Sequence, residues 1–344
     1  MNPECNLQDC PEKGIEPDSA RGGEGLIPVS LVTGFLGSGK TTLIYRILRD
    51  PALARTAVIV NEFGEIALDH ELIARSDDAV LTLTTGCLCC AVQNDLARTL
   101  ATLLERRASG SADYDRVLIE TSGLSDPGPI LQTMMTDESV VRFYRMTSVM
   151  TVIDTVHGED ALDNHPEARH QVAVADTLLI SKTDLRSPSD RLIGWLDSLS
   201  PAAPRMTTLQ VDPARLFDSP YTGDAWDRPA VSPNRGRHQD IETFAVIRED
   251  ALPALVLTLL LQAIAEHCGS RMLRLKGLIA IKEMPGRPAV IHGVRHVMSA
   301  PDFLDRWPNE DHRTRIVFIG RGVPVHFVSR LLDAIEEELL DAAT

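Results

Sequence analysis

The sequence has no hydrophobic run long enough to cross a membrane as a helix. Its longest uncharged apolar stretch covers residues 251–265 and contains Pro253, whereas a spanning helix needs about 20 apolar residues. Residues 1–25 hold neither a basic segment nor an apolar core, so they do not form a secretory signal. We therefore expect a cytoplasmic protein with no membrane partner, whose cysteines stay reduced.

Basic residues are also scarce relative to acidic ones. The chain has 34 Lys and Arg against 49 Asp and Glu, which gives a formal net charge of −15. Such a surface repels nucleic acid and anionic lipid, so neither is an expected partner. Cations and basic protein surfaces suit this charge better.

Internal repeats are missing as well, and the order of apolar segments predicts two domains. Residues 1–25 are polar and rich in Gly, Pro and Glu, which predicts a disordered tail. From 26 to 200, continuous apolar strands alternate with helical patterns, which is typical of an α/β fold: a mostly parallel sheet covered by helices. Residues 201–240 are rich in Pro, Asp and Arg and predict a linker. Residues 241–344 lose the strict alternation and predict a smaller α+β domain. The apolar strands of the first domain are predicted, after one that begins near residue 27, at 56–61, 79–85, 115–121, 148–154 and 175–181.

A glycine-rich loop follows the first apolar strand. Residues 34–42 read GFLGSGKTT, which fits the pattern G-x-x-x-x-G-K-[ST] in its required place between a strand and a helix. The glycines let backbone N–H groups surround a phosphate beside the helix N-terminus. Lys40 is expected to neutralise the β- and γ-phosphates, and Thr41 to offer its hydroxyl to Mg²⁺. The candidate phosphate ligands are Gly34, Gly37, Ser38, Gly39, Lys40, Thr41 and Thr42.

Two later strand ends carry residues suited to binding the same nucleotide. Glu120 ends an apolar strand, where α/β folds bind ligands, and its carboxylate can hold Mg²⁺ directly or through water. Gly123 can let the backbone approach a γ-phosphate. Ser181, Lys182 and Asp184 form S-K-x-D after another strand.

GTPases use N-K-x-D at such a strand end to select guanine. The aspartate accepts two hydrogen bonds from guanine that adenine does not offer, and the lysine stem packs along the base. Ser181 stands where the asparagine is usual. Its hydroxyl is expected to replace part of the contact by which the amide helps to hold the loop in place. The pattern therefore predicts GTP as the nucleotide.

Cysteines are few, but half of the six lie within four positions. Cys87, Cys89 and Cys90 occur in TTGCLCC, between an apolar strand and a helix, where a helix start lowers thiol pKa values. A disulfide between the adjacent Cys89 and Cys90 would be strained, and no base that could activate a catalytic cysteine is adjacent in sequence. Three thiolates can instead bind one metal ion at about 2.3 Å each. Metal binding is favoured, with redox sensing and structural packing as alternatives.

The segment 61–72, NEFGEIALDHEL, lies in sequence between the phosphate loop and the cysteines. It follows a strand at the place where GTPases commonly put a nucleotide-sensing loop. Its candidate ligands are Glu62, Glu65, Asp69 and His70. We group Glu62 with Lys40 and Glu120 as candidate catalytic residues.

The chain resembles the CobW-like metallochaperone GTPases, relatives of the urease and hydrogenase nickel-insertion GTPases. The resemblance rests on five motifs that occur in the family's order: GFLGSGKTT, NEFGEIALDHEL, GCLCC, ETSGLSDP and SKTD. RLKGLIAIKEMPGRPAVIHGVRHVM and RIVFIGRG resemble that family's C-terminal domain, so the resemblance covers about residues 27–340. It implies GTP hydrolysis coupled to the handling of Zn²⁺, or less often Co²⁺ or Fe, for a client metalloprotein. It also implies that Cys87, Cys89 and Cys90 bind this metal and that Glu120 belongs to the Mg²⁺ network. Unlike many members, this chain has no histidine-rich run.

We therefore hypothesise a metal carrier whose zinc site senses GTP, which requires the cysteines and the phosphate loop to be neighbours in the fold. The main alternative is a P-loop NTPase whose cysteines are structural and that delivers no metal. A second is a zinc-binding interaction protein with a vestigial nucleotide site, against which the intact Lys40 and Thr41 argue. Formation of a homo-oligomer is left open.

Overall fold

The computed structural model describes residues 25–60, 80–82, 90–213, 241–269, 271–323 and 325–341. Several predicted features lie outside these residues: almost all of the tail, the segment 61–72 with Glu62, Glu65, Asp69 and His70, and most of the linker. Cys87 and Cys89 also lie outside them, and only the backbone of Cys90 is described.

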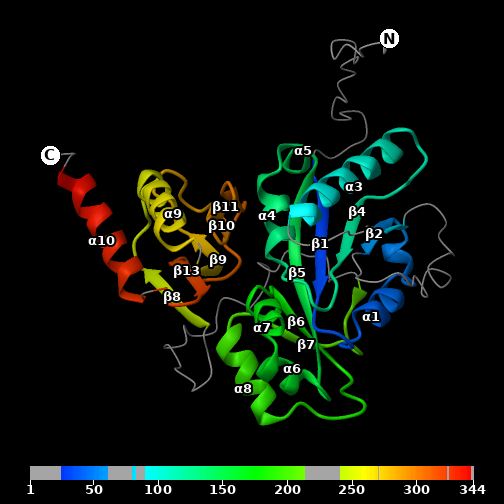
Figure 1. The fold of residues 1–344 in the computed structure, drawn as a ribbon. Helices are drawn as coiled ribbons and strands as arrows, with labels where there is room; N and C mark the ends of the chain where they lie inside the picture. Colours follow the sequence, from blue (N-terminus) through cyan, green and yellow to red (C-terminus); the bar gives the residue numbers. More distant parts are fainter. Residues whose placement is uncertain are drawn as a thin grey trace, which may run out of the picture.

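The described residues 25–213, here called the N-terminal domain, form a parallel sheet with helices on both sides (Figure 1). Its seven strands in these residues run in the order β3-β2-β4-β1-β5-β6-β7. They are β1 (Ile27–Thr33), β2 (Thr56–Val60), β3 (Val80–Thr82), β4 (Arg116–Glu120), β5 (Tyr144–Asp154), β6 (Thr177–Ser181) and β7 (Arg205–Thr207). The central strands are buried on both faces, as continuous apolar runs require. The predicted α/β class is confirmed.

Alternate residues of the sheet face two separate layers of helices. Val29 and Leu31 belong to a core with α3 and α4, whereas Val32, on the opposite face of the sheet, packs with α1. The helices of this domain are α1 (Lys40–Ile47), the 3₁₀ turn η1 (Pro51–Leu53), α3 (Cys90–Ala108), α4 (Gly128–Thr136), α5 (Glu138–Val141), α6 (Gly158–Asn164), α7 (Pro166–Ala173) and α8 (Asp190–Leu199). Because helices pack on both faces, the sheet is rigid, and the loops at the carboxyl ends of its strands start from fixed positions.

The described residues from 241 onward, here called the C-terminal domain, form an antiparallel sheet with α9 and α10 packed on it. The strand order is β11-β10-β9-β13-β8, and β12 pairs with β10. The elements are β8 (Glu242–Arg248), α9 (Ala254–Cys268), β9 (Met272–Ile279), β10 (Ala289–Val294), β11 (Val297–Met298), β12 (Asp302–Phe303), β13 (Thr314–Gly320) and α10 (Val325–Asp341). The smaller second domain of strands and helices is thus confirmed as a separate antiparallel sheet.

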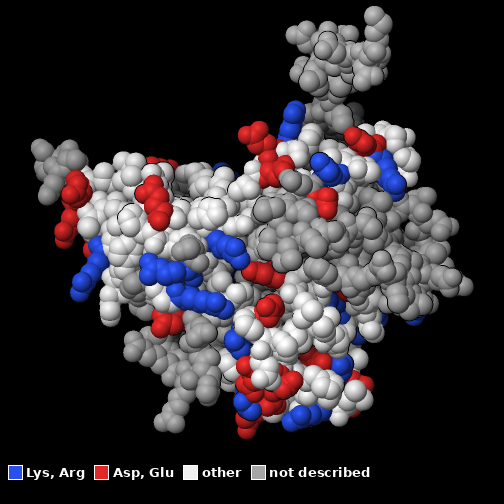
Figure 2. Space-filling model, in the orientation of Figure 1, with Lys and Arg blue, Asp and Glu red and all other residues white. Residues whose placement is uncertain are grey.

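Charged side chains mark the boundary between the two domains. Lys and Arg side chains gather on the C-terminal domain beside this boundary, and acidic side chains lie next to them on the N-terminal domain (Figure 2). Lys276 of β9 reaches across and donates to the carbonyl of Ala175 at 2.8 Å. Ile319 of β13 also packs into the core of α6, α7 and α8. The boundary therefore combines polar and apolar contacts.

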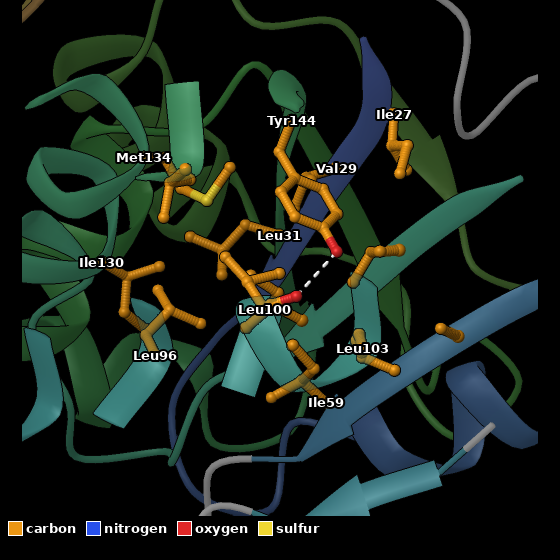
Figure 3. Packing of buried hydrophobic residues seen from close by; sticks show 14 of the residues in the cluster. Ile27, Val29, Leu31, Ile59, Leu96, Leu100, Leu103, Ile130, Met134 and Tyr144 are labelled. Atoms are coloured by element: carbon orange, nitrogen blue, oxygen red, sulfur yellow. Dashed lines mark hydrogen bonds between the residues drawn. The ribbon is translucent and has the colours of Figure 1, made fainter. Parts of the chain in front are cut away.

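The core under α3 contains a pair of buried tyrosines. Leu96, Leu100 and Leu103 of α3 line the same core as β1 residues (Figure 3). Tyr144 donates its hydroxyl to the carbonyl of Leu100 at 2.9 Å, and the hydroxyl of Tyr114 lies 2.9 Å from that of Tyr144. Burial raises the pKa of Tyr144 above its ordinary value, so this hydroxyl stays protonated. The pair fastens α3 to the amino end of β5.

One boundary prediction is wrong. Residues 201–240 were predicted as linker, but β7 lies within this range and pairs in parallel with β6. The strand has only three residues and sits at the edge of the sheet, so its apolar signal is too short to stand out among Pro, Asp and Arg. Across the described residues, no helix combines the length and apolarity that a membrane span requires.

Candidate nucleotide and metal site

The phosphate loop joins β1 to α1 and depends on backbone conformations that favour glycine. Gly34, Gly37 and Gly39 have φ angles of 143°, 71° and 95°, which side-chain-bearing residues rarely adopt. A Cβ atom on Gly34 would also collide with the carbonyl of Val152. Gly39 directly precedes α1, so the helix N-terminus faces the loop. This backbone can wrap around a phosphate.

Lys40 and Thr41 open α1 and point their polar atoms into the same site. The buried Lys40 donates to the carbonyls of Gly34 at 2.9 Å and Phe35 at 3.3 Å. Thr41 donates its hydroxyl to Glu120 at 2.7 Å. A cavity of about 260 Å³ brings together most of the predicted phosphate and magnesium residues. It is lined by Leu36, Gly37, Gly39, Lys40, Thr41, Thr42, Val60, Glu120, Thr121 and Gly123.

The oxygens of Thr41 and Glu120 fit a magnesium ion. Mg²⁺ prefers hard oxygen ligands, usually one or two from protein together with phosphate and water. The hydroxyl and carboxylate oxygens lie 2.7 Å apart, near the separation of about 3.0 Å between neighbouring ligands of an octahedral ion bound at about 2.1 Å. The residues present therefore suit the ion.

Ser181 connects the S-K-x-D segment to the phosphate loop. It ends β6, and its hydroxyl donates to the carbonyl of Ser38 at 2.6 Å. This is the kind of contact expected from a serine in place of the usual asparagine. A buried hydrogen bond of this length fixes the loop after β6 against the loop after β1.

Lys182 has a left-handed backbone with φ of 56° and pairs its ammonium with Asp154 at 2.8 Å. Burial alone would raise the pKa of Asp154, but hydrogen bonds from Lys182 and from the backbone N–H groups of His157 and Val156 lower it below its ordinary value. The carboxylate at the end of β5 thus holds the lysine stem in place. Asp184 is exposed, two residues farther along the chain.

The loop after β4 lies against the phosphate loop. A Cβ atom on Gly123 would come within 2.8 Å of the backbone of Leu36, so the two loops touch where only glycine fits. Gln171 of α7 donates its amide to the carbonyls of Gly123 at 3.1 Å and Ser125 at 3.0 Å. The buried amide of Gln171 thus fixes the backbone of residues 123–125, the loop predicted to approach a γ-phosphate.

Residues 28–207 match the family described as CobW/HypB/UreG, nucleotide-binding domain, and residues 241–336 match the cobalamin synthesis protein cobW C-terminal domain. The chain belongs to the CobW/HypB/UreG family. The resemblance stated from the sequence motifs is therefore confirmed.

Several proteins are similar to this chain over most of its length. The chain is 33% identical over 306 residues to the zinc chaperone YjiA of Escherichia coli K12, spanning 87% of this chain and 95% of that one. It is 28% identical over 361 residues to the zinc-regulated GTPase metalloprotein activator 1 of Saccharomyces cerevisiae, spanning 89% and 82%. The zinc-bound crystal structure of the E. coli YjiA GTPase matches with a TM-score of 0.67 and 28% identity, over 91% of this chain and 99% of that one.

In this family member, the strand that precedes the cysteines in sequence ends at the carboxyl edge of the sheet. Thr82, the last residue of β3, is in register with Val60, which is in register with Glu120. With strands about 4.8 Å apart, the backbone of Thr82 lies about 10 Å from that of Glu120. The chain returns at Cys90, where α3 begins. Among the described residues, no group of three His, Cys, Asp or Glu side chains could hold a metal.

Gln171 and Asp154 were not predicted as site residues from the sequence. Gln171 is fully buried in α7, far in sequence from the loop that it holds, and no motif surrounds it. Asp154 ends a predicted apolar strand, just as Glu120 does. A polar residue at that strand end is the signal that could have identified Asp154.

Proposed function

We propose that the protein is a GTP-hydrolysing metallochaperone that binds Zn²⁺ through Cys87, Cys89 and Cys90 and delivers it to a client protein. The family match and the zinc chaperones among its relatives support this proposal. The observation that carries it is the register of β3, β2 and β4, because the cysteine segment leaves the sheet two strands from Glu120. Co²⁺ is a second candidate cargo, since it accepts similar ligands.

In the proposed reaction, GTP lies with its phosphates in the glycine loop and its base beside Lys182 and Asp184. Lys40 exchanges the carbonyls of Gly34 and Phe35 for phosphate oxygens. Thr41 and Glu120 would hold Mg²⁺, which neutralises charge on the phosphates. Glu120 and Glu62 are the candidates for orienting the attacking water.

In this proposal, zinc is released when the loops between the nucleotide site and the zinc site change conformation. Contacts to the γ-phosphate order such loops in GTPases, and hydrolysis releases them. A coupling of about 1–3 kcal/mol changes zinc affinity by about 5- to 150-fold. That is enough to favour transfer when a client offers competing ligands. The cytoplasmic location and the transfer of metal to a client stay predictions.

Two variants separate this function from its main alternative. The triple variant Cys87→Ser, Cys89→Ser, Cys90→Ser is expected to lose bound zinc and any stimulation of turnover by zinc, while keeping basal magnesium-dependent GTP hydrolysis. Lys40→Ala is expected to lose turnover and keep zinc. Zinc content by atomic emission and phosphate release are the readouts. Unchanged zinc content in the triple variant would support the NTPase with structural cysteines.

A further inference from the structure

Asp126 lies in the loop that follows β4, close after Gly123, the residue proposed to meet a γ-phosphate. Its side chain contacts the C-terminal domain. Arg295, in the turn between β10 and β11, donates to the carboxylate of Asp126 at 2.8 Å across 169 positions of sequence. Only two residues lie between Gly123 and Asp126, so the position of one restricts that of the other.

The carboxylate of Asp126 is held from three sides. It accepts the backbone N–H of Gly128 at 2.9 Å, and His170 of α7 places Nδ1 at 3.7 Å. Burial would raise its pKa, but the contacts of His170 and Gly128 and the charge of Arg295 lower this pKa to about 2. Asp126 is therefore an anion at neutral pH and a fixed anchor for Arg295.

The helix α7 makes a second connection between the same loop and the C-terminal domain. Arg321 donates to Nε2 of His170 at 2.7 Å, which leaves the Nδ1 proton facing Asp126. The next residue, Gln171, holds the carbonyls of Gly123 and Ser125. Two arginines of the C-terminal domain thus contact this region: Arg295 binds Asp126 in the loop, and Arg321 binds His170, the neighbour of Gln171 in α7.

The backbone conformation of Arg295 follows from the tight turn in which it lies. Its φ of 56° is left-handed, and within the described residues only Lys182 shares this feature among residues other than glycine. A two-residue turn between the paired strands β10 and β11 favours this conformation. A Cβ atom on Gly128 would lie 3.1 Å from Asp126 and 3.5 Å from the Arg295 guanidinium, so Gly128 leaves room for the pair.

We propose that Arg295 is a positioning residue for GTP hydrolysis: it holds residues 123–126 from the C-terminal domain, so that the backbone of Gly123 meets the γ-phosphate. This inference rests on the proposed GTPase function. By linkage, binding of the γ-phosphate then also favours the docked C-terminal domain. In this proposal the C-terminal domain helps to position the loop that contacts the γ-phosphate.

A purely structural salt bridge is the competing explanation. The domain boundary has an independent attachment, since Lys276 and Arg274 pair with the buried Asp176 at 2.6 and 3.6 Å. Arg295→Ala should therefore leave the domains docked and change the loop alone. A structural role predicts lower stability with unchanged chemistry, whereas a positioning role predicts a lower kcat with nearly unchanged GTP affinity.

The test measures steady-state GTP hydrolysis and GTP affinity on the full chain. Arg295→Ala is expected to lower kcat by about 10-fold, since small displacements of positioning groups have effects of this size or larger, and to change the Kd for GTP by less than about 3-fold. Arg295→Lys and the charge exchange Asp126→Arg with Arg295→Asp are expected to recover part of the loss. The matched control is Arg287→Ala, which removes an exposed pair with Asp305 at 3.4 Å within the C-terminal domain.

A second readout keeps the inference separate from the GTPase proposal. Amide hydrogen exchange of residues 123–126 with a nonhydrolysable GTP analogue should show protection in the wild type and much less in Arg295→Ala. Equal protection in both, or a kcat of Arg295→Ala within about 2-fold of wild type, overturns the inference. Failure of the wild type to hydrolyse GTP overturns the proposed function, whatever the exchange result.

Discussion

Ser181 could be predicted as a site residue from the sequence, whereas Gln171 could not. The hydroxyl of Ser181 donates to the carbonyl of Ser38, whereas S-K-x-D predicted only that this serine would help to hold its loop in place. Motif residues are predictable because a loop of fixed length must present them at fixed positions around a phosphate. Gln171 and Arg295 reach the site from distant segments, with no spacing to mark them. Only the folded chain brings these two to the loop that follows β4.

Guanine selection is expected to depend on the carboxylate of Asp184. In Asp184→Asn, one acceptor for the guanine N1–H and N2–H groups becomes a donor, which suits the 2-carbonyl of xanthine. Loss of hydrogen bonds to a charged group, worth about 1.5–3 kcal/mol each, should weaken GTP binding by at least about 10-fold, and xanthosine triphosphate should bind better than GTP. Competition against a fluorescent nucleotide measures both. Asp190→Asn, another exposed aspartate, serves as control, and unchanged selectivity in Asp184→Asn would remove guanine recognition from this motif.

The charge of Asp126 should make stability depend on pH in the acid range. Its pKa falls from an ordinary 3.8 to about 2 on folding, so its contribution is complete above the higher value and disappears as the pH falls through the lower one. The difference in unfolding free energy between wild type and Asp126→Asn should be constant from pH 7 to about 5 and shrink below about pH 4. Urea unfolding at several pH values gives this difference. A difference that grows as the pH falls would contradict the assignment.

Among the elements, strands were easier to predict than their edges. The central strands were located to within a few residues because burial on both faces requires a continuous apolar run. The edge strand β7 escaped because only three residues pair, and none is buried. The helix α7 carries the contacts to the loop after β4, yet its sequence has only weak amphipathic character. Short elements, and helices whose buried face includes a polar residue such as Gln171, leave little signal.

The contact between α3 and β5 should depend on both tyrosine hydroxyls, but unequally. Tyr144→Phe removes the donor to Leu100 and the partner of Tyr114, which leaves buried polar groups without a hydrogen bond. A loss of about 1–3 kcal/mol is expected. Tyr114→Phe keeps the bond to Leu100 and should cost less, about 0.5–1.5 kcal/mol. Urea denaturation compares the two, and a larger loss in Tyr114→Phe would show that the donor directions are wrong.

For the whole molecule, the family could be recognised from motifs, but the attachment of the two domains could not. Asp176, between α7 and β6, is buried and accepts the backbone N–H of Val149 at 2.7 Å. Burial alone would raise its pKa, but the charges of Lys276 and Arg274 lower it below its ordinary value. Alternation of charged and apolar residues along β9 indicates two faces, without telling which face meets another domain.

Asp176→Asn should destabilise the chain strongly. It leaves Lys276 and Arg274 buried at the domain boundary without their counter-charge, and breaking such a group typically costs about 3–5 kcal/mol. Urea unfolding should show the loss, or a separate early transition of one domain. Asp305→Asn is the control, since this aspartate is 98% exposed and should change stability by less than about 0.5 kcal/mol. Equal stability of both variants would mean that the buried cluster does not hold the domains.

Zinc affinity with and without bound nucleotide is the most direct measurement of whether one site senses the other. The Kd for Zn²⁺ can be determined by competition with a chromophoric chelator, under reducing conditions, with and without Mg²⁺ and a nonhydrolysable GTP analogue. We expect the two values to differ by about 5- to 150-fold, and the difference to vanish in the variant that carries serine at positions 87, 89 and 90. Identical zinc affinities in the two states would contradict a nucleotide-gated metal carrier.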